Sequence, residues 1–318
     1  MDSFTGKVAV VTGGGSGMGR ELVRQLGAQG CSVATCDLHA DAVAETAEMA
    51  SARASDGASV TGHVCDVADE AQVIRFRDEL LERHATDHLD LVFSNAGIGG
   101  GGSFFRDSRE AWERTFAIDW WGVYYCARAF LPLLIASEEG VLVNTSSVSG
   151  FWATLGPGRP NSAYSSAKFA VKGFSEALIE DLRANAPHVR VAVVMPGHVG
   201  TNILTNSRRV LGLPEPQDMS DAELESARDE LIGRGALAGD RSIQELRQMA
   251  ARQTIEFRDH APITSAQAAA TILDGVRSGS WRILIGQDAA MLDTFVRAEP
   301  EAAYEYAALA QFARERRT

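Results

Sequence analysis

The first two hundred residues alternate between two hydrophobic patterns, and this alternation constrains the fold more than any other feature. Short runs rich in β-branched residues predict strands at 7–12, 32–37, 59–66, 89–94, 140–146 and 189–195. Stretches with helical spacing lie between them, at 20–27, 40–53, 69–84, 108–135 and 161–185. Strands that alternate with helices and are apolar along their length predict a parallel sheet covered on both faces. We therefore expect a doubly wound α/β fold with ligands beyond the carboxyl ends of the strands.

The pattern changes after Pro196. Residues 201–262 contain Pro214 and Pro216, an acidic and then a basic segment, and no clear strand. We expect a mostly helical excursion there, long enough to cover a substrate site, although a surface decoration would have the same pattern. A seventh strand is predicted at 281–285 and one or two terminal helices at 288–316. We find no repeat or linker, so the prediction is a single Rossmann-fold domain over residues 1–318.

The composition excludes several classes of protein. With 45% hydrophobic and 23% charged residues, the chain has the make-up of an ordinary globular protein. No apolar run reaches the length of about 18 residues that a membrane span needs. Residues 1–4 lack the pattern of a signal peptide. The net charge of −12 argues against nucleic acid or an anionic membrane as a partner. We therefore expect a cytoplasmic protein.

Neither the cysteines nor the histidines indicate a metal site. The four cysteines at positions 31, 36, 65 and 126 form no Cys-x-x-Cys pair, and we interpret them as small buried hydrophobic residues. His84 and His88 have the i,i+4 spacing of a metal-binding pair, but the exposed end of a helix is the favoured interpretation. The sequence therefore predicts no catalytic metal.

A glycine-rich segment follows the first predicted strand directly. Residues 12–19 read TGGGSGMG, and a helical pattern begins at once. Glycines permit a tight turn and bring the backbone close to a pyrophosphate at a helix N-terminus, where amide groups are unsatisfied. A plain turn would use the same residue types, but the strand before and the helix after favour a nucleotide. The candidate cofactor residues in this segment are Gly13, Gly15, Ser16, Gly17, Met18 and Gly19.

Asp37 ends the second predicted strand. A carboxylate at this position can accept hydrogen bonds from both ribose hydroxyls and repels a 2′-phosphate. Asp also favours turns and helix N-caps, which is the structural alternative. Because Ser16 in the glycine-rich segment and Leu38 are neutral, the residues favour NAD over NADP as the cofactor.

Five short motifs occur in a fixed order along the chain. They are Thr12-Gly-x-x-x-Gly-x-Gly, Asn95-Ala96-Gly97, Ser146-Ser147, Tyr164-x-x-x-Lys168 and Pro196-Gly197. Together they resemble the short-chain dehydrogenase/reductase family over residues 5–203, and the strand at 281–286 continues the match. The resemblance implies an NAD(P)-binding Rossmann fold and an oxidoreductase activity. It also implies a homodimer or homotetramer that uses the helices at 108–135 and 161–185 as contact faces.

The resemblance also implies further cofactor contacts, position by position. Asp66 and Val67 match the residues at the adenine, and positions 95–97 match the segment along the adenosine ribose. The loop from Pro196 to Thr201 matches the one that receives the nicotinamide carboxamide. The complete set of implied contacts is Asp66, Val67, Asn95, Ala96, Gly97, Tyr164, Lys168, Pro196, Gly197, Val199 and Thr201.

Tyr164 and Lys168 lie four residues apart in a helical pattern, so both project from one face. An unperturbed tyrosine has a pKa of about 10, and a nearby ammonium favours the phenolate and lowers this pKa. We expect Tyr164 to donate a proton to a carbonyl oxygen while hydride arrives at the carbon, and to reverse this in oxidation. Ser147 is the candidate for orienting the substrate. Ser146 is the alternative, because residues 151–160 contain an insertion relative to the family.

Asp119 departs from the family pattern. The matching helix of the family ordinarily has Asn at this position, and its backbone carbonyl helps to hold a water that links the lysine to solvent. The backbone group survives the change, but a carboxylate near Lys168 adds a negative charge. We hypothesise an active enzyme in which Asp119 occupies this position of the proton relay.

The substrate is the least defined part of the prediction. Phe151 and Trp152 are candidates for an apolar pocket wall, although aromatic residues at such positions are more often part of the core or of an interface. With the excursion at 201–262, they suggest a bulky, apolar secondary alcohol or ketone. The function predicted is NAD-dependent hydride transfer on such a substrate. The alternatives are an NAD-binding protein with little catalysis, or another chemistry of this family such as epimerisation, dehydration or imine reduction.

Overall fold

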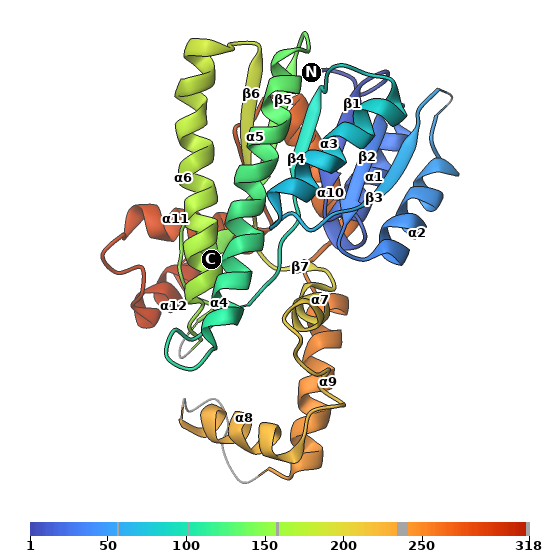
Figure 1. Cartoon of the computed structure of the whole chain (residues 1–318). Helices are drawn as coiled ribbons and strands as arrows, with labels where there is room; N and C mark the ends of the chain where they lie inside the picture. Colours follow the sequence, from blue (N-terminus) through green and yellow to red (C-terminus); the bar gives the residue numbers. More distant parts are fainter. Residues whose placement is uncertain (56, 101, 157–158, 234–240, 316–318) are drawn as a thin grey trace.

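The computed structural model describes residues 1–55, 57–100, 102–156, 159–233 and 241–315. Its centre is a seven-stranded sheet in which all neighbouring strands are parallel, in the order β3-β2-β1-β4-β5-β6-β9 (Figure 1). These strands are β1 Val8–Thr12, β2 Ser32–Asp37, β3 Val60–Val64, β4 Leu91–Ser94, β5 Gly140–Thr145, β6 Val189–Pro196 and β9 Arg282–Ile285. The seven strands predicted from the sequence are therefore confirmed, with small differences at their ends.

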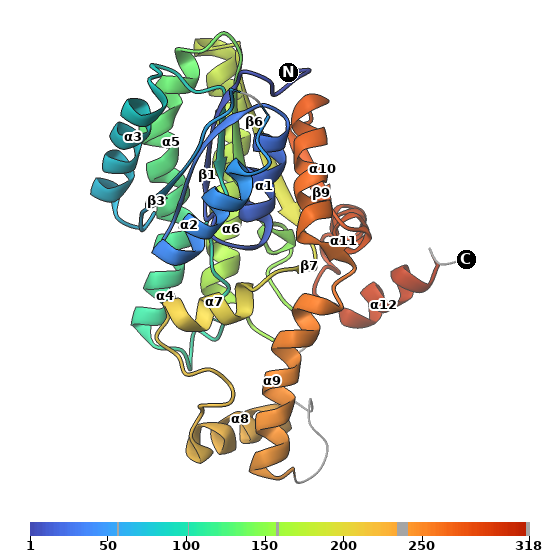
Figure 2. The same ribbon diagram turned by 90° about the vertical axis from the view of Figure 1, so that its right-hand side faces the viewer.

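Helices cover both faces of the sheet (Figure 2). One face carries α1 Gly17–Ala28, α2 Ala40–Ser51 and α10 Ser265–Arg277, and the other carries α3 Glu70–His84, α5 Gly122–Ile135 and α6 Ser162–Asn185. Successive residues of β1 serve the two layers in turn: Ala9 and Val11 pack in one hydrophobic core, and Val10 packs in the other. This alternation explains why β1 is apolar along its whole length, because both of its faces are buried.

The strand order places a ligand site beside β1. Chain order reverses there, because β1 lies between β2 and β4. The connections after β1 and β4 leave the sheet in opposite directions, and the crevice between them at the carboxyl ends of the strands is where such folds bind ligands.

The long helix predicted at 108–135 is interrupted by a wider turn. α4 Arg109–Phe116 continues into a π-helical turn, Ala117–Trp121, before α5 begins. Such turns are rare and frequently lie at functional sites. The turn contains Asp119, which is completely buried.

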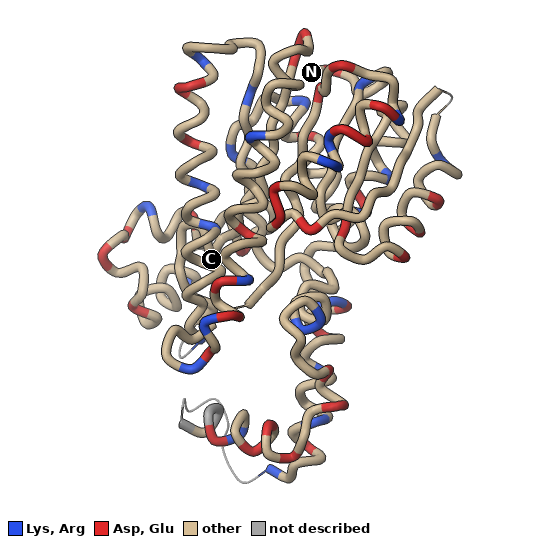
Figure 3. The backbone as a smooth tube through the Cα atoms, in the orientation of Figure 1, with Lys and Arg blue, Asp and Glu red and all other residues tan. Residues whose placement is uncertain are grey.

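The excursion is mostly helical, as predicted. It contains α7 Ile203–Val210, α8 Asp221–Gly233 and α9 Ile243–Asp259, and a short parallel pair, β7 Val199–Gly200 with β8 Ile263–Thr264, closes its base. The α8–α9 hairpin projects from the sheet and carries charges of both signs (Figure 3). Residues 234–240 of the predicted excursion and 157–158 of the predicted insertion lie outside the described residues.

The C-terminal prediction is also confirmed, with α11 Gln287–Ala298 and α12 Tyr306–Glu315. Within the described ranges, no helix has both the length and the apolar content that crossing a membrane would require. All four cysteines are free thiols buried in the interior, as expected. His84 is the last residue of α3, and Ala85 follows with a φ of 48°. His88 therefore lies beyond the helix, and the two histidines do not share a helical face.

Candidate active site

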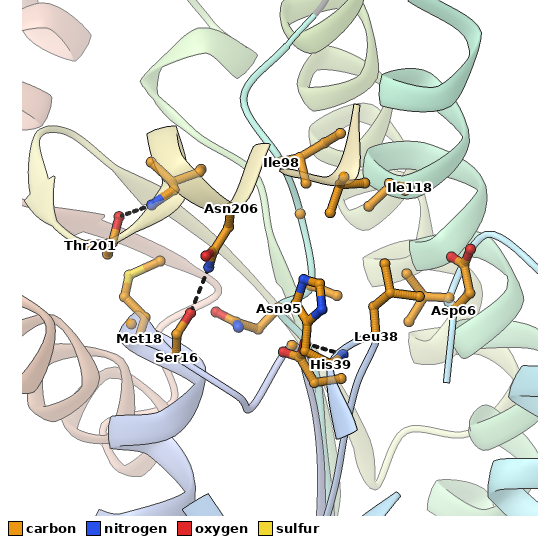
Figure 4. A pocket seen from close by; sticks show the side chains of 18 of the residues that line it. Ser16, Met18, Leu38, His39, Asp66, Asn95, Ile98, Ile118, Thr201 and Asn206 are labelled. Atoms are coloured by element: carbon orange, nitrogen blue, oxygen red, sulfur yellow. Dashed lines mark hydrogen bonds between the residues drawn. The ribbon is translucent and has the colours of Figure 1, made fainter. Parts of the chain in front are cut away.

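A cavity opens at the carboxyl ends of the central strands, where the strand order reverses (Figure 4). Most of the predicted cofactor residues line it: Gly13, Ser16, Gly17, Met18, Asp37, Leu38, Asp66, Val67, Asn95, Ala96, Gly97 and Thr201. Eight further residues line the cavity and were not predicted from the sequence: His39, Cys65, Ile98, Arg114, Ile118, Ile203, Asn206 and Val210. Most of the missed residues are apolar or come from α4 and α7, and no local motif marks them.

The glycine-rich segment forms one wall of the cavity. Gly13 has a φ of 68°, and a Cβ there would come within 2.7 Å of the Ala96 Cα, so a larger residue would push the two walls apart. The chain then enters α1 at Ser16. The amide groups of the first turn of α1 have no intrahelical carbonyl partner, which suits an anion beside them.

The second wall is tied to the first through Thr12. The Thr12 hydroxyl accepts hydrogen bonds from the backbone N–H groups of Asn95 (3.0 Å) and Ala96 (3.1 Å). The Asn95 amide in turn donates to the Thr12 carbonyl at 3.1 Å. These bonds join the end of β1 to the end of β4, so the two walls hold a fixed spacing.

Asp37 is held in place by the backbone on both sides. Its Oδ2 accepts the N–H of Gly15 at 2.9 Å, and its Oδ1 accepts the N–H of His39 at 3.1 Å. Each carboxylate oxygen retains acceptor capacity beyond these bonds. The carboxylate therefore lies at the cavity wall with a fixed orientation.

Asp66 has a partner that the sequence analysis did not identify. Its Oδ2 lies 2.6 Å from the Arg114 guanidinium of α4, and its Oδ1 accepts the N–H of Ala68 at 3.0 Å. The two charged residues are 48 positions apart in the sequence. Only the tertiary structure brings α4 against the loop after β3.

Lys168 and Asp119 form a buried ion pair beside Gly97. The Lys168 Nζ lies 3.0 Å from Asp119 Oδ1 and donates to the Thr145 carbonyl at 3.1 Å. The side chains of Lys168 and Asp119 are 3% and 0% exposed. A Cβ on Gly97 would come within 2.6 Å of Asp119 Oδ1, so only glycine fits there. Since Gly97 also lines the cavity, the ion pair lies directly behind the cavity wall.

Tyr164 adjoins this pair, with its ring centroid 5.4 Å from the Lys168 Nζ. Burial raises the pKa of Tyr164, and the Asp119 charge raises it further. Lys168 and a hydrogen bond from Ser147 lower the pKa but do not overcome burial. The expected effect of Lys168 is therefore present, because its ammonium lowers the pKa of Tyr164, but burial outweighs it and the net pKa is raised. The reason is the low-dielectric surroundings, which disfavour the phenolate.

Burial shifts the pKa values of the two partners of the ion pair in opposite directions, although both net pKa values are raised. Burial raises the pKa of Asp119 to about 6, although Lys168 and the Ile98 backbone lower it. Burial lowers the pKa of Lys168, but Asp119 and Tyr164 outweigh it, and the net pKa is raised. Lys168 therefore stays an ammonium at neutral pH, and the pKa of Asp119 lies above the usual range of a carboxyl group.

The two adjacent serines have different environments. Ser146, which is 2% exposed, donates to the Lys168 carbonyl at 2.8 Å and so ties β5 to α6. Ser147 accepts the N–H of Ser149 at 3.1 Å and hydrogen-bonds Tyr164. Of the two hydroxyls, the one on Ser147 lies at Tyr164.

Phe151 and Trp152 lie on the side of the C-terminal helices. The Trp152 indole N–H donates to the Ala303 carbonyl at 2.7 Å, and its ring packs in a cluster with Leu292. The Phe151 ring lies 5.9 Å from the Arg282 guanidinium. The structure therefore joins the predicted substrate wall to a segment some 150 residues downstream.

The loop after β6 is held by β9 and α11. The N–H of Gly197 donates to the Ile285 carbonyl at 2.9 Å, and the N–H of His198 donates to Asp288 Oδ2 at 2.7 Å. Val199 is buried in the short strand β7, and Thr201 reaches the cavity near Gly17. Of this predicted set, Thr201 alone is among the lining residues, and Pro196 forms the end of β6.

Comparison with known proteins identifies the family. Residues 7–211 match the family described as short chain dehydrogenase. A putative oxidoreductase SadH from Mycobacterium tuberculosis is 34% identical over 297 residues, which cover 93% of this chain and 92% of that protein. Meso-2,3-butanediol dehydrogenase from Serratia marcescens is 33% identical over 63% of this chain and 74% of its own length. The chain therefore belongs to the short-chain dehydrogenase/reductase family of oxidoreductases.

A solved structure supports the same assignment. A short-chain dehydrogenase/reductase from Burkholderia phymatum in complex with NAD superposes with a TM-score of 0.73 and 27% identity. The superposition covers 94% of this chain and 97% of that protein. The resemblance to the family that was stated from the motifs is thus confirmed.

Proposed function

We propose that the protein transfers a hydride between NAD and a bulky, apolar secondary alcohol or ketone, with Tyr164 as the acid/base. The observation that supports this most strongly is the arrangement of Tyr164, Lys168 and Ser147 beside the Gly97 wall of the cofactor cavity. A phenol, an ammonium and a hydroxyl at one place can exchange a proton with a substrate oxygen and stabilise the charge on it.

The residues would act as follows. Ser147 donates a hydrogen bond to the substrate oxygen, and Tyr164 donates its proton to that oxygen in reduction or accepts it in oxidation. Lys168 is held by the Thr145 carbonyl and favours the phenolate that forms on Tyr164. When bound, the nicotinamide supplies or accepts the hydride. Because the pKa of Tyr164 is raised, its hydroxyl is protonated at neutral pH and can donate a proton.

Asp119 completes the proposed relay. Its carboxylate contacts Lys168 in a buried position, and its pKa of about 6 allows it to exchange a proton near neutrality. In this proposal Asp119 replaces the neutral side chain usual in the family and lends a negative charge to the relay. That charge opposes formation of the Tyr164 phenolate.

The preference for NAD rests on Asp37. Its oxygens are oriented by the N–H groups of Gly15 and His39, and their remaining acceptor capacity suits two ribose hydroxyls. A 2′-phosphate at the same place would meet a fixed negative charge.

The proposal of a bulky, apolar substrate rests on residues 151–156 and on residues 303–306, which contact them. Hydrogen bonds link residues 152–154 to residues 303–306. An apolar cluster includes Phe151 and Trp152. A long apolar loop between Ser147 and Tyr164 favours a bulky apolar substrate. The Serratia relative is named for a small diol, so substrates of both sizes belong in the test.

We also propose a homodimer or homotetramer in the cytoplasm. Trp121 and Phe169 are each 42% exposed, and aromatic contacts link Trp120 on the π-helical turn with Phe174 on α6. Exposed aromatic side chains on the π-helical turn and on α6 suit a contact with a second copy. Light scattering after size-exclusion chromatography tests this, and a monomer would contradict it.

The test of the catalytic proposal is an absorbance assay for reduced nicotinamide with secondary alcohols and ketones from small diols to fused-ring compounds. Tyr164→Phe should reduce kcat by about 10²-fold or more, since it removes the proton donor. Its NADH affinity, measured by fluorescence, should stay within about twofold of the parent, because hydride transfer is not needed for binding. A variant that keeps full turnover would contradict the role of Tyr164. Binding of NADH without turnover of any compound would contradict the proposed activity.

A further inference from the structure

Helix α7 lies along the cofactor cavity and contributes one face to it. Ile203, Asn206 and Val210 line the cavity and are spaced three or four residues apart, as one face of a helix requires. In Figure 4, Asn206 lies over the glycine-rich segment and points toward Ser16. The helix therefore covers the side of the cavity on which the pyrophosphate is expected.

Two consecutive residues fasten α7 to the two walls. The Asn206 Nδ2 donates to the Ser16 Oγ at 3.0 Å, which joins α7 to the glycine-rich segment. The Ser207 Oγ accepts the N–H of Gly99 at 2.7 Å, which joins α7 to the segment after β4. Ser207 is 3% exposed, so this second bond is shielded from water. The helix thus bridges the cavity from one wall to the other.

The Ser16 hydroxyl is available for this bond because it does not cap its own helix. Ser16 is the N-cap residue of α1, with an extended backbone at φ −158° and ψ 176°. A serine at such a position ordinarily accepts a hydrogen bond from the first turn of its own helix. Among the described residues it makes no such bond, and it accepts from Asn206, 190 positions away. The unpaired amide groups in the first turn of α1 are therefore left without a bond to the Ser16 side chain.

We propose that α7 is a strap that retains the bound dinucleotide and that Asn206 is the positioning residue that fastens it. The dinucleotide lies between the glycine-rich segment and α7, so it leaves only after the Asn206–Ser16 bond breaks. This proposal depends on the nicotinamide dinucleotide of the proposed function and on nothing about the substrate. It predicts that this single bond slows release of the cofactor.

The test is the rate of NADH release, followed by stopped-flow fluorescence after mixing the NADH complex with excess NAD. Asn206→Ala should release NADH about two- to tenfold faster, the range that one lost hydrogen bond gives. Asn206→Asp keeps the shape but removes the donor and adds a negative charge near the pyrophosphate, so its release should be at least as fast. Asn202→Ala is the matched control, because Asn202 is the N-cap of the same helix without a side-chain capping bond, is exposed, and is absent from the cavity wall. It should release NADH at the parent rate.

A double-mutant cycle with Ser16→Ala separates the bond from other effects. If the bond retains the cofactor, Asn206→Ala should add nothing to the release rate once the Ser16 hydroxyl is gone. Parent-like release from Asn206→Ala, or full additivity of the two substitutions, would overturn the strap. A parent protein that binds no NADH would overturn the proposed function and the strap together. Binding with unchanged release overturns the strap alone.

Discussion

The cofactor end and the catalytic end of the site are built in different ways. The cofactor end relies on backbone geometry: the glycine-rich segment at 12–19 supplies one wall, and the Asp37 carboxylate is oriented by two backbone N–H groups. The catalytic end consists of side chains from three separate elements, in which Asp119, Ser147 and Lys168 converge. The first depends on glycines and local geometry, and the second depends on burial and charge.

This difference predicts how each end responds to substitution. Changes at the catalytic end alter the protonation of buried groups, so they should affect turnover and its pH dependence. Each change at the cofactor end removes one of many contacts to a large ligand. Such changes should therefore alter cofactor affinity by smaller factors than those expected for turnover at the catalytic end.

The largest expected effect separates the two serines. Ser147→Ala should lower kcat about 10²-fold, because it removes a donor to the developing charge on the substrate oxygen. Ser146→Ala, at the adjacent residue, is the matched control, and it removes the hydrogen bond from the Ser146 hydroxyl to the Lys168 carbonyl. It should cost about 1 kcal/mol of unfolding free energy with a smaller loss of kcat. Steady-state kinetics and denaturant unfolding measure both, and a reversed ranking of kcat would assign the substrate contact to Ser146.

Asp119→Asn should shift the pH profile of oxidation toward lower pH. Above a pH of about 6 the Asp119 carboxylate is ionised, and its charge raises the pKa of Tyr164. The neutral amide removes that charge, so the pKa of Tyr164 falls and the phenolate forms at a lower pH. We expect a shift of about one pH unit in kcat/KM.

The control for this shift is a buried aspartate outside the site. Asp90 is 3% exposed and pairs with Lys7 at 2.8 Å at the opposite end of β1. Asp90→Asn should lower the unfolding free energy and leave the pH profile of turnover in place. Superimposable profiles for the parent and Asp119→Asn would show that the Asp119 side chain has no role in the relay.

Asp37→Ser tests the cofactor end. Removal of the fixed carboxylate should narrow the preference for NADH over NADPH about tenfold, since the repulsion of a 2′-phosphate is lost. Asp41→Ser, a change of the same kind on the exposed first turn of α2, should leave the preference unchanged. Fluorescence titration with the two reduced cofactors gives the ratio. Equal affinities in the parent protein would contradict the proposed preference for NAD.

The smallest expected effect concerns the loop between Ser147 and Tyr164. The hydroxyl of Tyr304 accepts the N–H of Ala153 at 3.2 Å, and the hydroxyl of Tyr306 hydrogen-bonds Thr154 at 3.2 Å. Replacing both tyrosines with Phe should raise KM for bulky substrates about two- to fivefold, because two weak hydrogen bonds no longer order the wall. Affinity for NADH should not change. A uniform change for small and bulky substrates would mean that the loop does not shape the pocket.

Several parts of this protein followed from the sequence alone. The strands were predictable because both of their faces are buried, which makes short apolar runs such as those at 32–37 and 140–146 unmistakable. The glycine-rich wall was predictable because its residues are contiguous and their backbone geometry demands glycine. Tyr164 and Lys168 were predictable as a pair because they share one helix face.

Other features were decided by the tertiary structure. Arg114 meets Asp66, Asn206 meets Ser16, and Trp152 meets Ala303 only because remote segments pack together. The direction of the Tyr164 pKa shift was decided in the same way. A sequence lists the charges near a group, but the balance between those charges and desolvation depends on burial, which is set by the whole fold. For this chain, the sequence determined the chemical groups and the family, and the tertiary structure decided their partners and their protonation.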